Sequence, residues 1–263
     1  MQKIISYNVA GLRPRVPLVE RILVQESPDF LLLQEIKTTS ETFPFTAFEK
    51  YGYYLSFVGQ KSFNGVALFS KEKPNDVITM LPDTYENEPQ ARFIEARFNN
   101  CLSVISVYIP NGNPPEKDPL DTSRLIYKLN WMNALKKYIS TLKDTGQSVI
   151  IGGDFNVIAS DTDVYNPEAY RTNALMVPPV RRAFEDFSKI GLINTLRYKT
   201  NETHLYSFWD FQMGAWPKNY GMLLDYIFVS SDLESRLTDS VILKNYRGFN
   251  KPSDHVPVCC ILA

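Results

Sequence analysis

The chain has 263 residues, of which 44% are hydrophobic and 22% charged, and this is enough apolar material for one large packed domain. Its net charge of −1 excludes a globally basic chain, so an enzyme acting on DNA would need a local basic patch. Charge alone favours a small-molecule enzyme.

The cysteines and the N-terminal residues bear on where the protein works. Cys101, Cys259 and Cys260 do not make a disulfide framework, and the last two lie in an apolar run that predicts buried thiols. A reducing compartment follows, so we expect a cytoplasmic protein, with nucleoid or nucleus as alternatives. Residues 1–13 lack a signal-peptide pattern, and no apolar run is long enough to span a bilayer, so no membrane partner is expected.

Taken in chain order, β-branched and apolar runs predict eight strands, several of them apolar throughout, as is typical of strands covered on both faces. Helical periodicity predicts three helices, over residues 16–25, 121–143 and 180–189. Strands and helices are interspersed without a linker or repeat, which predicts a single α/β domain over residues 1–263 with a mixed sheet. The expected strands span residues 3–9, 30–34, 65–70, 93–98, 102–108, 148–152, 223–229 and 256–262.

Polar side chains adjoin these apolar runs at six places. Ends of strands are where α/β proteins assemble sites from separate segments. A lone Asp or Asn at such a place is more often a turn former or a helix cap, but six together are harder to explain in that way. The residues concerned are Asn8, Glu35, Tyr108, Asn111, Asp154, Asn156, Asp225, Asp254 and His255.

This set of side chains favours metal-assisted hydrolysis. Carboxylate and amide oxygens suit a hard cation such as Mg²⁺, which proteins usually hold through one or two carboxylates and the oxygens of a substrate phosphate. Thiolates are missing from the set, and the chain has two histidines in all, which excludes a histidine-rich zinc site. His255 would stabilise charge on a phosphate or move a proton, with a neighbouring carboxylate fixing its tautomer.

Five of the segments that carry these residues resemble the exonuclease III family of AP endonucleases, within the endonuclease/exonuclease/phosphatase superfamily. Each motif is short, but they occur in the order of the family and span nearly the whole chain. The resemblance implies a four-layer α/β sandwich, in which two packed mixed β-sheets are flanked by helices, as in DNase I-like folds. The segments are SYNVAGLR at 6–13, LQEIK at 33–37, YIPNG at 108–112, GDFNV at 153–157 and KPSDHVP at 251–257, with GVALFSK at 65–71 and LDYI at 224–227 in addition.

The resemblance implies a metal site. Glu35 would bind the ion with Asn8 close by, and Asp254 would help to hold the ion or its waters. Ala10 stands where relatives usually carry Asp or Asn, which removes a further ligand. We therefore expect one ion, Mg²⁺, with Mn²⁺ as the alternative.

The resemblance also implies the chemical step, an in-line attack of water at phosphorus that leaves a 3′-hydroxyl. Asp154 would position or deprotonate the water, and we favour it as the base, with His255 as a charge stabiliser. Asp225 would orient His255. The other groups beside the phosphate or the water would be Tyr108, Asn111 and Asn156.

The implied substrate is double-stranded DNA with abasic or 3′-blocked sites, cut 5′ to the abasic site and trimmed by 3′–5′ exonuclease or end-cleaning activity. Phe208 and Trp209 would wall a pocket for the base-less sugar, although core packing is the alternative, more so for Trp209. Arg13 and Lys37 would touch DNA phosphates, or are ordinary solvated charges. Further pocket residues would be Met222 and Leu224.

Departures from the family leave alternatives open. Leu223 replaces a common Arg, and the loop after Asn111 lacks the Arg that some relatives insert into the duplex, so Gln212 and Met213 are candidates for the opposite wedge. A phosphatase or non-specific nuclease of the same superfamily, or an inactive DNA-binding module, remain as alternatives. Binding alone would not require the whole acidic and imidazole set, which argues against the inactive module. We expect a monomer.

Overall fold

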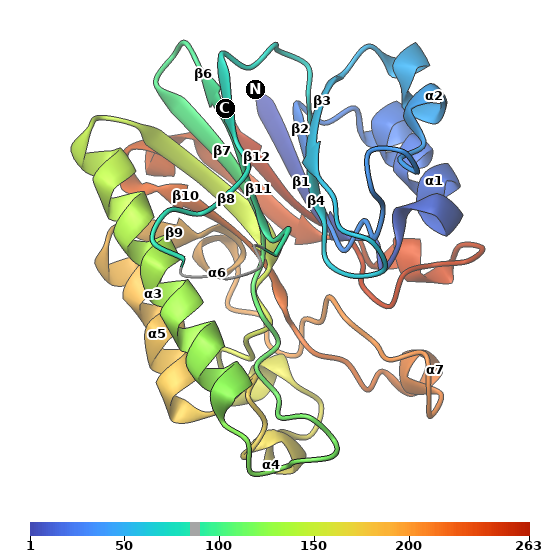
Figure 1. The fold of residues 1–263 in the computed structure, drawn as a ribbon, viewed down its shortest axis with the longest axis vertical. Coiled ribbons are helices and arrows are strands. Elements are labelled where there is room, and N and C mark those ends of the chain that lie inside the picture. The colour runs from blue at the N-terminus through green and yellow to red at the C-terminus, as the bar shows by residue number, and fades with distance from the viewer. Residues whose placement is uncertain (85–89) are drawn as a thin grey trace.

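The computed structural model describes residues 1–84 and 90–263, and two six-stranded sheets packed face to face form its centre (Figure 1). The first sheet has the order β11 (Leu237–Ile242), β12 (Val258–Leu262), β1 (Gln2–Asn8), β2 (Phe30–Gln34), β4 (Val66–Ser70) and β3 (Tyr54–Val58). The second has the order β5 (Asp76–Ile78), β6 (Phe93–Phe98), β7 (Leu102–Tyr108), β8 (Ser148–Asp154), β10 (Asp225–Ser230) and β9 (Leu192–Asn194).

Alternating side chains of the central strands fill two different layers of the core. Ile4 and Leu32 of the first sheet belong to a cluster with Val104 and Ile150 of the second, so one apolar layer lies between the sheets. The neighbouring Ile5 belongs instead to a cluster with helical residues on the outer face of the first sheet. Burial on both faces explains why these strands are apolar throughout.

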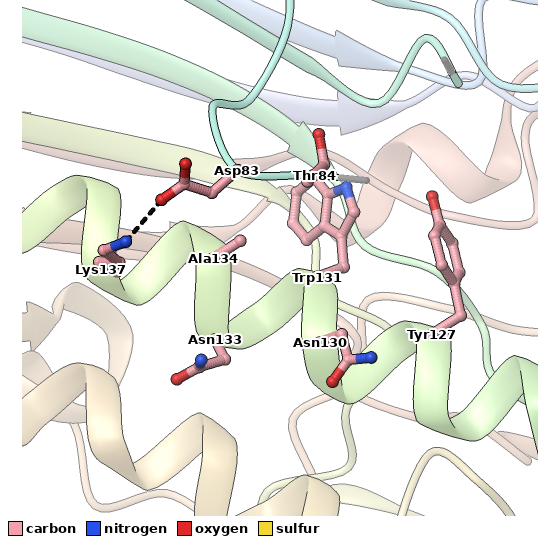
Figure 2. Close-up of a pocket in the computed structure, with 8 residues that line it drawn as sticks. All are labelled: Asp83, Thr84, Tyr127, Asn130, Trp131, Asn133, Ala134 and Lys137. Atoms are coloured by element: carbon pink, nitrogen blue, oxygen red, sulfur yellow. Dashed lines mark hydrogen bonds and ion pairs between the residues drawn. The ribbon is translucent and has the colours of Figure 1, made fainter. Parts of the chain in front are cut away.

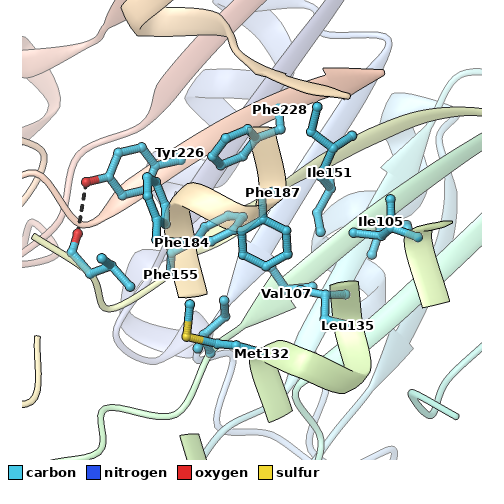
Figure 3. Packing of buried hydrophobic residues seen from close by; sticks show 14 of the residues in the cluster. Ile105, Val107, Met132, Leu135, Ile151, Phe155, Phe184, Phe187, Tyr226 and Phe228 are labelled. Carbon is cyan, nitrogen blue, oxygen red and sulfur yellow. Dashed lines mark hydrogen bonds between the residues drawn. The ribbon is translucent and has the colours of Figure 1, made fainter. Parts of the chain in front are cut away.

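Helices cover the outer faces of the two sheets. On the first sheet α1 (Leu12–Arg21), continued by the π-helical turn Ile22–Glu26, packs Leu12 and Val19 against the outer cluster. On the second sheet α3 (Ser123–Asp144) and α5 (Pro178–Lys189) pack Leu135, Phe184 and Phe187 against the strands (Figure 3). The shorter helices are α2 (Phe45–Phe48), α4 (Pro167–Tyr170), α6 (Thr195–Lys199) and α7 (Ala215–Lys218), with 3₁₀ turns at Glu49–Tyr51, Asp161–Asp163, Ser231–Arg236 and Lys244–Gly248.

The four-layer sandwich expected from the sequence is confirmed, and both sheets are mixed. The eight predicted strands are present, three with the predicted bounds and five with ends displaced by one or two residues, and four further strands were not predicted. These are β3, β5, β9 and β11, each at or next to a sheet edge and short or partly exposed, so they lack a clear apolar pattern. In the part of the chain that the structure describes, none of the helices has the length and apolar character that crossing a membrane requires.

The register of the second sheet places three polar residues side by side. Parallel strands β7 and β8 pair Tyr108 with Asp154, and antiparallel β10 pairs Asp225 with Asp154 from the other side. Asp225 was expected just after a strand had begun at residue 223, but it is the first residue of β10. Because β10 runs antiparallel to β8, its first residue lies beside the last residue of β8, and the same edge of the sheet collects both carboxylates.

The cysteines lie as the sequence indicated. Cys259 and Cys260 are buried in β12, and burial raises the pKa of each thiol to about 12, so they are unreactive. Cys101 is exposed in the turn that precedes β7.

Candidate active site

Asp154, the last residue of β8, is 1% exposed and stands at the centre of a hydrogen-bonded group. Its Oδ1 accepts a hydrogen bond from the backbone N–H of Asn156 at 2.9 Å. Its Oδ2 accepts one from the Asn8 amide at 2.9 Å and lies 3.7 Å from Nε2 of His255. The carboxylate is thus held by the ends of two strands from different sheets.

A possible cation site lies beside this carboxylate. Glu35, Asp154 and His255 each offer a ligand atom, and these atoms lie within 4.8 Å of one another. Asn8 donates from its amide nitrogen to Glu35 Oε1 at 2.9 Å as well as to Asp154, while its own oxygen accepts from the N–H of Ala10 at 3.0 Å. The carboxylate oxygens fit a hard divalent cation, and Asn8 as placed orients them.

Asp254, which was expected to help hold the metal, and Lys37, which was expected to touch a DNA phosphate, are placed differently. The Asp254 carboxylate accepts a hydrogen bond from Ser253 Oγ at 3.2 Å. Among the described residues, it is not part of the group of Glu35, Asp154 and His255, whose ligand atoms lie close enough together to share one ion. The Lys37 ammonium lies 2.7 Å from Glu35 Oε2, so it pairs with the carboxylate that was expected to hold the ion.

His255 is fixed by Asp225. Its Nδ1 lies 2.8 Å from Asp225 Oδ2, which also accepts a hydrogen bond from Ser207 Oγ at 2.6 Å. The same Ser207 hydroxyl accepts the backbone N–H groups of Leu224 and Asp225, each at 3.1 Å. The pair is therefore anchored through a serine to the start of β10, and Nε2 of His255 is left facing Asp154.

Burial and charge shape the ionisation of this group. Burial disfavours the imidazolium, but the Asp225 and Asp154 carboxylates outweigh it and raise the pKa of His255 to about 10. Burial raises the pKa of Asp154 to about 7, with Asp225 and Glu35 adding to the rise and His255 opposing it. Burial also opposes ionisation of Glu35, yet the pKa of this group is lowered, chiefly by the Lys37 ammonium and the Asn8 amide. A cationic imidazole thus sits among carboxylates in a water-poor site.

Three further groups predicted to face a phosphate line the same edge of the second sheet. Asn111 donates from its amide to Asn156 Oδ1 at 3.3 Å, and Asn156 donates to the carbonyl of Ile109 at 2.9 Å. Burial, together with the charges of Glu35 and Asp154, raises the pKa of Tyr108 well above its ordinary value, so the phenol stays protonated as a donor. The Arg92 guanidinium lies over the Tyr108 ring, 4.8 Å from its centroid.

An apolar cluster flanks His255. The ring of Phe208 lies 4.9 Å from the imidazole in an edge-on arrangement and packs against buried Met222 and Leu224. Trp209 needs correction as a pocket wall, because its side chain is 0% exposed and packs in the outer core of the first sheet beside Trp216. The alternating direction of neighbouring side chains sends Phe208 toward the site and Trp209 away from it.

The remaining predicted contacts lie on the surface. Arg13 is exposed in the first turn of α1, and Gln212 and Met213 are exposed in the segment before α7, which projects away from the sheets (Figure 1). None of the three was brought next to Asp154 by the fold, and a partner would have to reach them.

Three residues of the site have left-handed backbone conformations. The φ angles are 45° at Ala10, 52° at Glu35 and 52° at Asn156. Such conformations are unfavourable for residues with a Cβ and persist where the surroundings hold them, which is common at functional sites. Here they turn the chain sharply at the ends of β1, β2 and β8, where the functional side chains are displayed.

Several supporting residues carry no signal that the sequence could have revealed. Ser207 holds Asp225, and Ser253 donates to the carbonyl of Asn8 at 2.8 Å. Gln34 donates to Ser6 at 3.2 Å and to Ser106 at 3.0 Å, a polar bridge between the two sheets. Serine and glutamine are common everywhere, so these residues become recognisable only when the fold brings their partners together.

Two hollows differ in their relation to the site. A groove of about 870 Å³ begins at Asn111 and is lined also by Arg92, Arg124, Asn113 and the exposed ring of Phe63. A cavity of about 460 Å³ lies against α3, where an Asp83–Lys137 ion pair and Trp131 line it (Figure 2). Of these two hollows the first is continuous with the candidate site, and its lining carries two arginines against one acid, Glu116.

The fold and the site define a class, the metal-dependent phosphodiester hydrolases, and comparison with known proteins gives the family. Residues 5–255 match the model of the Endonuclease/Exonuclease/phosphatase family. The exodeoxyribonuclease of Bacillus subtilis is 33% identical over 263 residues, which are 99% of each chain. Among solved structures, an AP endonuclease from Archaeoglobus fulgidus superposes with a TM-score of 0.91 at 31% identity, covering 100% of this chain and 99% of its own.

A second solved structure is the 3′ phosphatase NExo from Neisseria bound to a product DNA hairpin, with a TM-score of 0.93, 31% identity and full coverage of both chains. The chain belongs to the endonuclease/exonuclease/phosphatase family, in the exonuclease III group that the sequence motifs indicated. It is a hydrolytic nuclease of the DNA-repair type, and the family to which it belongs is metal-dependent.

Proposed function

We propose that this chain, acting as one domain and as a monomer in the cytoplasm, cuts double-stranded DNA 5′ to abasic sites and trims blocked 3′ ends. The observation that carries the proposal is the placing of Asp154 between Tyr108 and Asp225, with the Glu35 carboxylate beside it to share an ion and the His255 imidazole facing it. An inactive DNA-binding module would not need two strands from each sheet to converge on a buried carboxylate.

One Mg²⁺ ion is proposed as the cofactor, with Glu35 as its main ligand and Asp154 beside it. When bound, this ion would act as a Lewis acid that neutralises charge on the phosphate. The Lys37 ammonium would then be repelled from Glu35 by the divalent ion and would become available to a DNA phosphate.

The residues of the chain would carry the reaction itself. Asp154 accepts a proton from water as the water oxygen bonds to phosphorus and the bond to the 3′ oxygen breaks. The leaving 3′ oxygen takes a proton from solvent and becomes a 3′-hydroxyl. His255, kept cationic by Asp225, faces the developing charge on the phosphate. The donors that orient the phosphate are Tyr108, Asn111 and Asn156.

The preference for abasic sites would come from the apolar cluster beside His255. Phe208, Met222 and Leu224 leave a small, water-poor surface that suits a sugar without its base. The groove that begins at Asn111 would take the flanking strand, with Arg92 and Arg124 against its phosphates.

A cleavage assay tests this proposal. Duplexes with an abasic analogue, a recessed 3′ end, a 3′-phosphate or no lesion would be incubated with Mg²⁺, Mn²⁺ or a chelator. We expect incision of the abasic duplex with either metal and none with the chelator. The 3′-phosphate arm tests the second candidate activity, removal of a terminal phosphate, which the likeness to the Neisseria 3′ phosphatase favours.

Asp154→Asn should lower the rate about 10²- to 10⁴-fold while DNA binding is retained. Asp186→Asn is the matched control, because Asp186 pairs with Lys136 and Lys189 on the outer helices, away from the site. Absence of incision by the wild type with both metals would overturn the proposal, and so would full activity of the Asp154 variant.

A further inference from the structure

Lys128 on α3 is a charged residue that is fully buried, at 0% exposure, and yet makes no ion pair at hydrogen-bond distance among the described residues. Its ammonium donates instead to three backbone carbonyls, those of Asn156 at 2.5 Å, Asn111 at 3.1 Å and Ala174 at 3.2 Å. In its protonated form the amine has three hydrogens, so each carbonyl takes one.

The three carbonyls belong to segments that are far apart in the sequence. Asn111 follows β7, Asn156 follows β8, and Ala174 lies before α5. Two of these residues carry the amides that line the candidate site, and those amides touch each other, since Asn111 donates to Asn156 Oδ1 at 3.3 Å. Lys128 therefore binds the backbone carbonyls of Asn111 and Asn156, the same two residues whose side-chain amides line the candidate site.

The loop after β7 is built closely around the lysine stem. Gly112 has a φ of 86°, and a Cβ there would come within 2.8 Å of Lys128 Cδ, so only glycine lets the loop lie against the lysine. Asn156 has a φ of 52°, a conformation that its surroundings must hold in place. Asn113 also connects two of the segments that Lys128 binds. It accepts a hydrogen bond from the N–H of Ala174 at 3.0 Å and donates one to Asn111 Oδ1 at 2.6 Å.

The position of this charge is energetically demanding. An ammonium removed from water is costly to bury, and burial lowers the pKa of Lys128 to about 7, with the Asp154 carboxylate opposing the shift. Without the lysine, three carbonyl oxygens would be left in the interior with one partner fewer each. The cost of burying this lysine is best explained by its effect on the loops whose carbonyls it binds.

We propose that Lys128 is the positioning residue of the active-site amides, setting Asn111 and Asn156 at the angle and distance from which they meet the phosphate. This rests on the proposed function, because it takes the two amides as the groups that contact the substrate. Lys128 does not itself touch substrate, and its effect passes through the two loops.

The test compares the same substitution at two lysines of α3. Lys128→Met keeps the apolar stem and removes the donors. Lys143→Met is the matched control, because Lys143 also donates to backbone carbonyls, those of Ile190 and Gly191, but at the other end of the helix. We expect Lys128→Met to lower kcat on an abasic duplex about 100-fold with a much smaller change in KM, since a small misplacement of catalytic groups has this effect. Lys143→Met should keep the wild-type kcat.

A spectroscopic measurement separates positioning from mere stability. In protein labelled with ¹⁵N-asparagine, the side-chain amide signals of Asn111 and Asn156 are assigned through their loss in Asn111→Ala and Asn156→Ala. These signals should shift in Lys128→Met and remain in place in Lys143→Met. Equal losses of thermal stability in the two variants, with wild-type kcat and unshifted signals in both, would overturn the proposal.

If Lys128→Met does not fold, Lys128→Gln decides, because its amide retains two donors. An intermediate kcat with shifted Asn signals supports the proposal, and wild-type kcat with unshifted signals refutes it. The amide signals are recorded without DNA. If the wild type failed to cut any duplex, the proposed function would fall, while these signals would still show whether Lys128 sets the two amides.

Discussion

The catalytic centre and the rim around it are built in opposite ways. In the centre Asn8, Asp154, Asp225 and His255 are between 0% and 4% exposed, and each is held by hydrogen bonds from another segment. At the rim the side chains are open to solvent, and Met213 is 79% exposed. Under the proposed function, the centre would fix the reaction through preorganised groups, whereas the rim would decide which DNA structures reach it.

The contrast extends to the backbone beneath each region. The centre stands on the ends of β1, β2, β7 and β8, the middle strands of the two sheets, where register leaves little freedom. Asp225 and His255 join it from the start of β10 and from the segment just before β12. The rim stands on the loop around α7 and on the first turn of α1. Substitutions in the centre should therefore affect every substrate alike, while those at the rim should affect substrates unequally.

The largest effect in the centre, apart from loss of Asp154, should come from Asp225→Asn. The asparagine would no longer stabilise the cationic imidazole or fix its tautomer, so kcat should fall on the order of 1,000-fold for abasic and recessed-3′ substrates alike. Steady-state cleavage of both substrates measures this. Asp232→Asn is the control, because Asp232 accepts from Ser148 at the opposite end of the second sheet. A loss confined to one substrate would contradict the claim that substitutions in the centre affect every substrate alike.

Between the centre and the rim, where the partly exposed Phe208 ring lies beside His255, Phe208→Ala should act on one substrate more than on another. Removing the ring opens the apolar surface beside His255, so incision at abasic sites should fall about 30-fold in kcat/KM, with a smaller change in exonuclease activity. The neighbouring Trp209→Ala should instead lower the free energy of unfolding by about 3–5 kcal/mol, since Trp209 is a core residue. Cleavage rates on the two duplexes, measured beside urea denaturation, distinguish the neighbours. Equal losses on both duplexes for Phe208→Ala would place its ring in the centre.

The smallest expected effect, for each pH unit, is a pH dependence of stability that depends on Lys128. In the folded chain this lysine loses its proton near pH 7, whereas in the unfolded chain it keeps it up to about its ordinary pKa of 10.5. Between these values the unfolded chain binds more protons, so folding becomes more favourable as pH rises, by up to about 1.4 kcal/mol per pH unit, and the dependence vanishes below pH 7. Urea denaturation of the wild type and of Lys128→Met at several pH values measures the difference. A constant difference across the window would show that the buried amine stays charged.

The sequence pointed to the residues of the proposed centre because they adjoin the ends or the starts of buried strands. An apolar run such as Phe30–Gln34 predicts a central strand, and a carboxylate directly after it is conspicuous. The family motifs then supplied the layers of the fold. Asp225 was identified although its strand begins two residues later than predicted, because antiparallel pairing with β8 brings it to the same edge.

The parts that escaped prediction depend on contacts between distant segments. β3 and β11 are partly exposed, so their alternation is irregular, and β5 and β9 have three residues each, too few to show a period. Ser207 acts through a hydroxyl that contacts Asp225, 18 residues away in the sequence. Lys128 acts through an ammonium that contacts Asn156, 28 residues away. Trp209 follows Phe208 directly, and only the fold shows which ring faces the site.

The single exposed cysteine among the three thiols provides a labelling site for following the protein during binding and cleavage. Cys259 and Cys260 are shielded inside β12, while Cys101 is exposed in the turn before β7, and Tyr108 of the active site ends that same strand. A strand of seven residues spans about 23 Å, so a dye or tether on Cys101 would sit at the opposite end of the sheet from the cleavage site. A maleimide probe should therefore label wild-type protein at one defined position without reaching the bound duplex, which makes single-molecule observation practicable without engineering the chain.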